Sequence, residues 1–462
     1  MVTEPETVPK IASAEQAASF APTVAATPRW VVLFLIFITL AVRTRVLLSL
    51  GGELRDDPDS YRELAWHLFE DRTFEYWSLG STNPTAYRPP LYPLVLSFFD
   101  YLPEQTTAYG LLHVGLGLVT VLAVWRIGLL AGLSRGAALA AASLVAFDPI
   151  LINQSVQIMN ETMSAALAMV AVLMLARLVN QPGIARSLLA GAPCGLAILC
   201  RPTFLPWTVL VAAALPWVLP IARRRAWLLT MIFALEAAAI VAPWGWRNWR
   251  QFGEPIVTTT HGGYTLLLAN NPSFYEYLRS GAWGSVWDAS SFHQEWNNEL
   301  RATMRETMRK RGTRFHLFEV PDELKADARA YELAFENIRR EPAMFAYSCL
   351  VRIGRLWSIV PHQLSDDEPL ARRLGRYAVG MWYLVEYAVA ALGAWLVGRR
   401  WQRSPWLWCL LLAFTFTLVH AFFWTDMRMR APLVGVIALA AAVGGAQLAA
   451  NARRTKPYQS VA

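Results

Sequence analysis

Three carboxylates, Asp56, Asp57 and Asp59, follow directly after the first strongly apolar segment of the chain and precede Tyr61. A carboxylate beside a membrane surface can act as a general base that takes a proton from a hydroxyl group. Aspartates also occupy ordinary solvated turns, because their side chains bond to nearby backbone N–H groups. The apolar spacing from Tyr61 onwards predicts an amphipathic helix, with the acids held at its start.

An arginine lies in a stiff turn farther along the same polar stretch, in the sequence Tyr87-Arg88-Pro89-Pro90. Proline fixes the backbone dihedral φ, so the position of the Arg88 guanidinium is restricted. A guanidinium presents a planar fork of N–H donors that matches a phosphate group. The turn therefore predicts a phosphate contact.

Two further acids are candidates for the same site, and a third lies apart. Glu161, in Asn160-Glu161-Thr162, begins a later apolar segment, where an acid can also simply satisfy the helix dipole. Asp148 lies at the end of the preceding apolar segment and is expected to line the same cavity. Glu236 falls inside an apolar run, where a lone ionisable group must be neutral, paired or in a wet cavity.

More arginines recur at the ends of apolar segments, at Arg201, Arg247, Arg428 and Arg430. Any one of them could anchor the protein among lipid headgroups. Grouped with Arg88 around an acidic loop, they instead favour a pocket where carboxylates and a bound phosphate lie together.

The composition predicts the class of fold that positions these residues. Hydrophobic residues make up 55% of the 462, and there are 20 tryptophans, more than a soluble core could bury. The fold class predicted is an all-α polytopic membrane protein with about ten transmembrane helices. The predicted spans are Trp30–Leu50, Ala108–Leu130, Gly136–Ile152, Met159–Val179, Leu188–Leu199, Phe204–Ile221, Ala226–Pro243, Tyr377–Val397, Trp406–Phe423 and Ala431–Ala450.

The arginine-rich short loops, such as Arg223-Arg224-Arg225, predict the orientation, because loops of this kind stay in the cytoplasm. Both termini are then cytoplasmic, and the candidate residues lie on the outer side of a bacterial-type inner membrane. The net charge of +8 is thus mainly a topology signal. No basic domain supports binding to nucleic acid.

The segments outside the spans complete the predicted organisation. A short surface helix is expected over 91–102, and a partly helical outer subdomain over 247–341, with helices at 292–310 and from Pro321 to Glu341. The apolar segment 342–361 carries Arg352 and Arg355, so it is predicted to lie along the outer interface or to be re-entrant, with its arginines toward headgroups or a cavity.

The domain boundaries predicted follow from this pattern. They are a disordered tail 1–29, a catalytic transmembrane module 30–246 with an outer loop 51–107, an outer loop subdomain 247–375, C-terminal helices 376–450 and a second tail 451–462. The four cysteines have neither metal-ligand spacing nor an obvious disulfide partner, so no zinc site is predicted.

The order of these motifs resembles the GT-C-type glycosyltransferases related to protein O-mannosyltransferases and lipid A aminoarabinose transferases. The shared pattern is the acidic loop, the Tyr-Arg-Pro-Pro-x-Tyr-Pro turn, Asn-Glu-Thr, Arg-Pro, Pro-Trp-x-x-Arg-Asn and a late Arg-x-Arg-x-Pro, between Asp56 and Pro432. The resemblance implies an inverting transfer of a sugar from a polyprenyl-phosphate donor to a hydroxyl acceptor, either a glycolipid, a protein or a cell-envelope glycan.

The resemblance also implies roles for single residues. It places the base at Asp57, with Asp59 and Asp56 as alternatives, because this chain has Asp56-Asp57 where the protein O-mannosyltransferase pattern has Asp-Glu. It makes Glu161 a second, orienting acid and Arg88 a phosphate contact. Arg247, Arg428 and Arg430 are weaker phosphate candidates, and the remaining pocket candidates are Asp56, Tyr61, Tyr87, Asp148 and Arg201. Relatives differ in their use of divalent metal ions, and the sequence indicates no metal or other cofactor.

Two other classes of protein fit some of these features. A transporter would have a similar number of spans, and Glu236 favours it, but transporters often consist of related halves, and the chain has no convincing internal repeat. A non-catalytic envelope-assembly subunit would use the outer segment as a binding surface.

Overall fold

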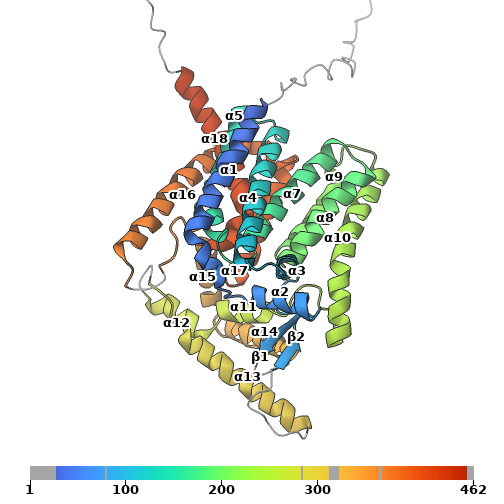
Figure 1. The fold of residues 1–462 in the computed structure, drawn as a ribbon, viewed down its shortest axis with the longest axis vertical. Helices are drawn as coiled ribbons and strands as arrows, with labels where there is room; N and C mark the ends of the chain where they lie inside the picture. The colour runs from blue at the N-terminus through green and yellow to red at the C-terminus, as the bar shows by residue number, and fades with distance from the viewer. Residues whose placement is uncertain (1–27, 79–80, 282–284, 312–321, 364–366, 455–462) are drawn as a thin grey trace, which may run out of the picture.

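The computed structural model describes residues 28–78, 81–281, 285–311, 322–363 and 367–454. Most of both predicted tails, as well as Pro321, lies outside the described residues. The first described helix begins and the last one ends at the same end of the molecule, while α2, α13 and α14 lie at the opposite end (Figure 1).

Ten apolar helices form the body of the protein. Six are long and apolar enough to cross a membrane: α1 (Arg29–Leu50), α4 (Gln105–Leu130), α7 (Glu161–Asn180), α10 (Arg223–Phe252), α16 (Leu370–Val397) and α18 (Val434–Arg454). Four are shorter: α5 (Arg135–Ala146), α8 (Ile184–Cys200), α9 (Phe204–Val218) and α17 (Trp406–Phe422). They correspond to the ten predicted spans, and the prediction of an all-α polytopic membrane protein is confirmed. The side of the membrane on which each loop lies stays a prediction.

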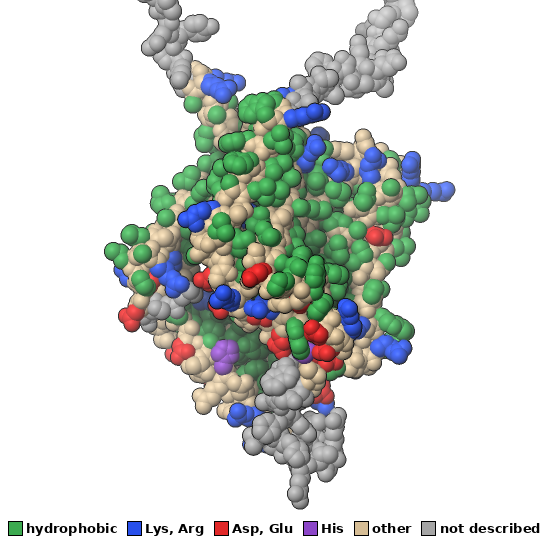
Figure 2. Space-filling model, viewed as in Figure 1, with side chains coloured by type: hydrophobic (Ala, Val, Ile, Leu, Met, Phe, Trp, Pro, Cys, Tyr) green, Lys and Arg blue, Asp and Glu red, His purple; other side chains and the backbone are tan. Residues whose placement is uncertain are grey.

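Hydrophobic side chains cover the helical body, as Figure 2 shows. In that view, one group of arginines lies at the end where α9 meets α10, and most acidic side chains lie in the other half of the molecule, together with further arginines and lysines.

Two predicted span boundaries differ from the structure. The predicted span 136–152 is interrupted, because α5 ends at Ala146 and a separate short helix, α6 (Pro149–Gln154), follows. Pro149 cannot donate a backbone hydrogen bond, and the Asp148 carboxylate caps α6 by accepting from the Leu151 N–H at 2.8 Å. α10 continues nine residues past the predicted end at Pro243, which carries Arg247 beyond the apolar part of the helix.

Close helix packing depends on glycine at a few positions. A Cβ on Gly393 of α16 would collide with the backbone of Ala440 in α18, and one on Gly191 of α8 would meet the Phe233 carbonyl of α10. Small residues of this kind let helix backbones approach closely within a membrane.

The first outer segment contains a 3-10 turn, η2 (Gly51–Arg55), the helix α2 (Tyr61–Glu70) and the antiparallel hairpin β1 (Glu75–Ser78) and β2 (Ser81–Pro84), which pairs Glu75 with Pro84. The Arg88 turn follows β2 and leads into α3 (Leu91–Ser97), which is shorter than the helix predicted over 91–102.

The second outer segment is helical, in agreement with its predicted character. It contains α11 (Gly262–Ala269), α12 (Pro272–Ser280), α13 (Ser290–Arg311), α14 (Glu323–Arg340) and α15 (Pro342–Leu356). A small core of Leu266, Leu267, Phe292, Ala330 and Ala334 holds α11, α13 and α14 together.

The sequence predicts that the arginines of α15 face headgroups or a cavity. For Arg352 this prediction is wrong. Arg352 is fully buried and donates to the carbonyl oxygens of Ala269 at 2.5 Å and Ala421 at 2.7 Å. These carbonyls lie at the C-terminal ends of α11 and α17, where backbone oxygens lack helical partners and carry partial negative charge. Arg352 therefore joins three helices.

Candidate functional site

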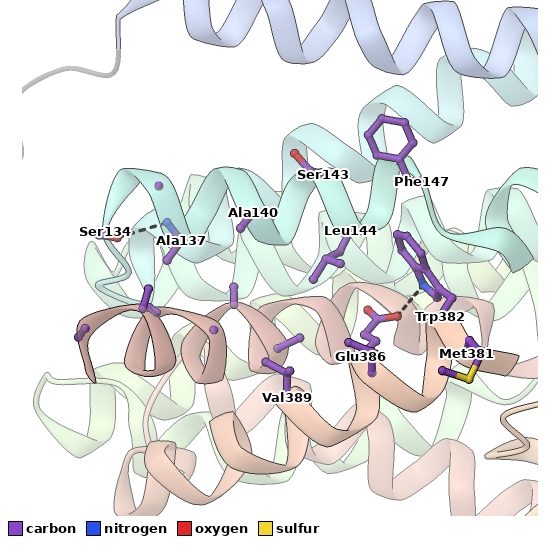
Figure 3. A pocket seen from close by; sticks show the side chains of 18 of the residues that line it. Ser134, Ala137, Ala140, Ser143, Leu144, Phe147, Met381, Trp382, Glu386 and Val389 are labelled. Atoms are coloured by element: carbon purple, nitrogen blue, oxygen red, sulfur yellow. Dashed lines mark hydrogen bonds between the residues drawn. The ribbon is translucent and has the colours of Figure 1, made fainter. Parts of the chain in front are cut away.

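The larger of two prominent cavities is an apolar groove of about 1020 Å³ between α5, α16 and α18 (Figure 3). Its walls are mostly alanine, glycine and valine. Glu386 is the carboxylate among the lining residues, and one of its oxygens accepts from Trp382 Nε1 at 3.0 Å. This groove offers no set of cations for a phosphate.

The second cavity, of about 650 Å³, is polar and gathers most of the predicted site residues. Five charged side chains line it, namely Asp59, Arg88, Glu161, Arg201 and Arg428. Three arginines against two carboxylates leave an excess of one positive charge, which suits an anionic ligand. We refer to it below as the polar cavity.

One wall of the polar cavity is the pair formed by Asp59 and Arg88. The Arg88 Nη2 donates to Asp59 Oδ1 at 2.8 Å, and its Nε donates to the Asp59 backbone oxygen at 3.1 Å. The guanidinium also lies 5.7 Å from the ring centre of Tyr61 and 5.3 Å from that of Tyr87. The proline-rich turn thus holds Arg88 between two aromatic rings at the cavity surface.

Asp57 lies outside the polar cavity, at the start of α2. Its carboxylate accepts from the backbone N–H groups of Tyr61, Arg62 and Glu63, at 2.8, 2.9 and 3.2 Å. It therefore satisfies the free donors at the start of α2, and it is absent from the lining of the polar cavity. Burial raises the pKa of Asp57, and the three backbone hydrogen bonds oppose that rise.

A second group of charged residues in the lining of the polar cavity surrounds Glu161, which is buried. This carboxylate, at the first turn of α7, lies 3.9 Å from Arg201 Nη2 and 3.8 Å from Arg428 Nε. Arg428 is also bonded to Asp426 at 3.1 Å. Arg201 follows α8, and Arg428 precedes α18, so three segments far apart in the sequence meet here.

The other predicted site residues divide into two groups. Tyr61, Tyr87 and Arg201 line the polar cavity, as expected. Asp56 is exposed and does not line it.

Three predicted site residues, Asp148, Arg247 and Arg430, lie outside the polar cavity as well. Asp148 is buried and accepts from the Tyr383 hydroxyl at 2.9 Å, while Arg430 stacks over the Tyr383 ring at 4.2 Å and donates to the Leu356 carbonyl. Arg247 donates to backbone carbonyls. All three have bonding partners within the protein, and their part in the candidate site stays a prediction.

Sequence reasoning missed His261, which lines the polar cavity at the start of α11. Burial and the charge of Arg88 hold the pKa of His261 well below its usual range, so the imidazole is neutral. Its ring lies 4.1 Å from that of Tyr87 and 5.4 Å from that of Tyr264. The only local signal was the polar run Thr258–Thr260 followed by Gly262-Gly263, which marks a loop without indicating a site.

Asp327 of α14 makes the stability of the folded protein depend on pH. Burial, and to a lesser degree the charge of Glu323, raises the pKa of Asp327 to about 6, against one hydrogen bond from the Gly263 N–H. The folded protein therefore binds a proton that the unfolded chain releases between pH 3.8 and about 6. Stability falls as pH rises through this window and is constant above it.

We expect Asp327→Asn to remove this dependence and to stabilise the protein above pH 6 by about 1 kcal/mol, a value reduced for solvent screening of the half-buried group. The measurement is thermal unfolding of both proteins in lipid nanodiscs at pH 5 and pH 7.5. Equal pH-induced shifts in the two proteins would contradict this origin of the effect.

Residues 87–246 match the family model of the dolichyl-phosphate-mannose-protein mannosyltransferases. Among curated proteins the comparison found no match.

Solved structures share the fold at low sequence identity. An oligosaccharyltransferase, AglB from Archaeoglobus fulgidus, in complex with an inhibitory peptide and a dolichol-phosphate, aligns with a TM-score of 0.51 and 14% identity over 94% of this chain and 53% of that one. The same enzyme tethered to an acceptor peptide aligns with a TM-score of 0.55, 14% identity, and coverages of 92% and 50%. This chain thus spans about half the length of the archaeal enzyme. ArnT from Cupriavidus metallidurans bound to undecaprenyl phosphate gives a TM-score of 0.41 at 15% identity, over 94% and 82% of the two chains.

The family match and the shared fold confirm the resemblance to the GT-C-type glycosyltransferases. The chain is a multi-pass membrane protein of that fold.

Proposed function

We propose that this protein transfers a sugar from a polyprenyl-phosphate donor to a hydroxyl acceptor at the outer face of the membrane, with inversion at the anomeric carbon. The single observation that supports this most is the polar cavity, where Arg88, Arg201 and Arg428 lie with the carboxylates of Asp59 and Glu161. The solved relatives of similar fold include a complex with a dolichol-phosphate.

The arginines can stabilise the departing phosphate. As the bond between the anomeric carbon and the phosphate oxygen breaks, the phosphate gains negative charge, and cations already in place lower the energy of that step. Arg88 and Arg428 both line the cavity with part of the side chain exposed, 16% for Arg88 and 28% for Arg428. We favour Arg88 for direct contact, because its guanidinium is also held between the rings of Tyr61 and Tyr87. Arg428 and Arg201 lie in the second group, where Glu161 orients them.

A carboxylate must take the proton of the attacking hydroxyl. We assign this role to Asp59 and no longer to Asp57, because Asp59 lines the polar cavity with 25% of its side chain exposed, whereas Asp57 is engaged by three backbone N–H groups. Arg88 bonds to Asp59 Oδ1, so Oδ2 is the oxygen placed to accept a proton from the hydroxyl. A donor phosphate that binds Arg88 would loosen the Asp59 pair and free the carboxylate to bond to the hydroxyl.

The acceptor stays open between a glycolipid, a protein and a cell-envelope glycan. Glu236, the feature that favoured transport, packs against Gly191 of α8 and does not line the polar cavity. The part of the chain that the structure describes also holds no group of three or more metal-ligating side chains placed to bind an ion.

The test is transfer of labelled sugar from a panel of polyprenyl-phosphate sugars, in liposomes that contain the purified protein and a membrane extract as acceptor. We expect transfer from at least one donor by the wild type and none by a variant that carries both Asp59→Asn and Arg88→Ala. Equal signal in both proteins would disprove this site. Substrate flux across the liposome without transfer would instead support a transporter.

A further inference from the structure

The turn that carries Arg88 is bonded to a helix more than 200 residues away. The Thr85 hydroxyl donates to Glu323 Oε2 at 2.7 Å, and the Ala86 N–H donates to Glu323 Oε1 at 2.8 Å. The Tyr87 N–H in turn donates to Thr85 Oγ1 at 2.9 Å. The three residues before Arg88 are thus linked to Glu323, the first residue of α14. Thr85 and Ala86 bond to it directly, and Tyr87 is linked to it through the Thr85 hydroxyl.

Arg247 of α10 bonds to the same turn. Arg247 Nη1 donates to the Thr85 carbonyl oxygen at 2.6 Å, and its Nη2 donates to the Phe74 carbonyl at 2.8 Å. Phe74 also accepts from the Thr85 N–H at 3.1 Å. The side chain, N–H and C=O of Thr85 are therefore all bonded, by groups from α10, from α14 and from Phe74, the residue before β1.

Glu323 also links the turn to the loop that precedes α11. Its Oε1 accepts from the Thr260 hydroxyl, and the Thr260 N–H donates to the Ala86 carbonyl at 3.1 Å. The next residue is His261, whose ring packs on Tyr87. One turn farther along α14, Asp327 accepts from the Gly263 N–H. Positions i and i+4 of α14 therefore hold the cavity loop in place.

We propose that Glu323 and Arg247 form a clamp on Thr85 that positions Arg88 for the donor phosphate, with Glu323 as a positioning residue rather than a catalytic one. The inference rests on the proposed function, because it concerns the same cavity. The group positioned is the phosphate contact, so the clamp acts on the donor KM, and because Arg88 also bonds to Asp59 we expect kcat to fall with it.

The hydrogen-bond chemistry explains why Glu323 is hard to replace. Its carboxylate accepts from three donors, and the residues that it holds are buried: Thr85 is 1% exposed and Ala86 is fully buried. A glutamine would place an NH₂ group where one carboxylate oxygen accepts, so at least one of these bonds to a buried group loses its charge-assisted acceptor. The turn would then shift, and small shifts of a phosphate contact have large kinetic effects.

The test compares E323Q with E332Q, a matched substitution on the exposed side of α14, where Glu332 is 64% exposed and pairs with Arg329. We expect E323Q to raise the donor KM roughly tenfold while the acceptor KM stays unchanged, and E332Q to behave as wild type. Hydrogen exchange measured in nanodiscs should be faster at the Ala86 to Arg88 amides in E323Q alone. A second variant, Thr85→Val, keeps the shape of the residue and should reproduce both effects if E323Q folds poorly.

Each outcome decides the proposal. A wild-type donor KM in E323Q overturns the positioning role, even if exchange is faster. If the wild-type protein transfers sugar from no donor, the proposed function fails, and exchange alone then decides the clamp: faster exchange at Ala86 supports it and unchanged exchange overturns it.

Discussion

Asp59→Asn is expected to lower the rate of sugar transfer by about 10²- to 10⁴-fold, the range observed when a general base is removed. Asparagine is almost the same size as aspartate, and its amide oxygen can still accept from Arg88. The fold and the donor site should therefore persist, while the group that takes the hydroxyl proton is lost. The measurement is kcat in liposomes, together with donor binding, which should remain within a few-fold of wild type.

Asp57→Asn is the matched control, since it makes the same chemical change two residues away. An asparagine keeps one of the two oxygens that accept from the start of α2, so we expect a smaller loss of stability than in Asp57→Ala and near-normal transfer per folded protein. Asp57→Ala should instead destabilise α2 by about 1–2 kcal/mol, because the N–H groups of Tyr61, Arg62 and Glu63 lose their acceptor. An inactive Asp57→Asn beside an active Asp59→Asn would return the base to Asp57.

Arg88→Ala has the second largest expected effect. It removes a guanidinium that lies at the cavity surface between two tyrosine rings, so the donor phosphate loses a charge-assisted contact. We expect a rise in donor KM of roughly 10²-fold and a fall in kcat, because the phosphate carries more charge in the transition state than in the bound donor. Initial rates over a range of donor concentrations would measure both parameters.

Two comparisons make the Arg88 result specific. Arg88→Lys keeps the charge without the planar fork and should lie between Arg88→Ala and wild type. Arg55→Ala removes an exposed arginine of the same outer segment and should leave both parameters unchanged. If Arg55→Ala and Arg88→Ala weakened donor use equally, the effect would come from surface charge and not from the cavity.

The sequence by itself determined the class of the protein and much of the candidate site. Hydropathy and length are local properties, so the ten apolar segments, the helical outer subdomain and the start of α2 could be predicted from runs of neighbouring residues. The same holds for Arg88, Glu161, Arg201 and Arg428, which stand at the ends of apolar segments and do line one cavity.

The tertiary structure alone decided what each polar group does. Asp57 and Asp59 lie two residues apart in one acidic loop, and only the fold shows that one carboxylate meets the backbone donors of α2 while the other meets Arg88. Likewise Arg247 bonds to Thr85, and the distant Glu323 bonds to the same residue. A charged side chain acts through the partners that reach it, and those partners come from segments that only the fold brings together.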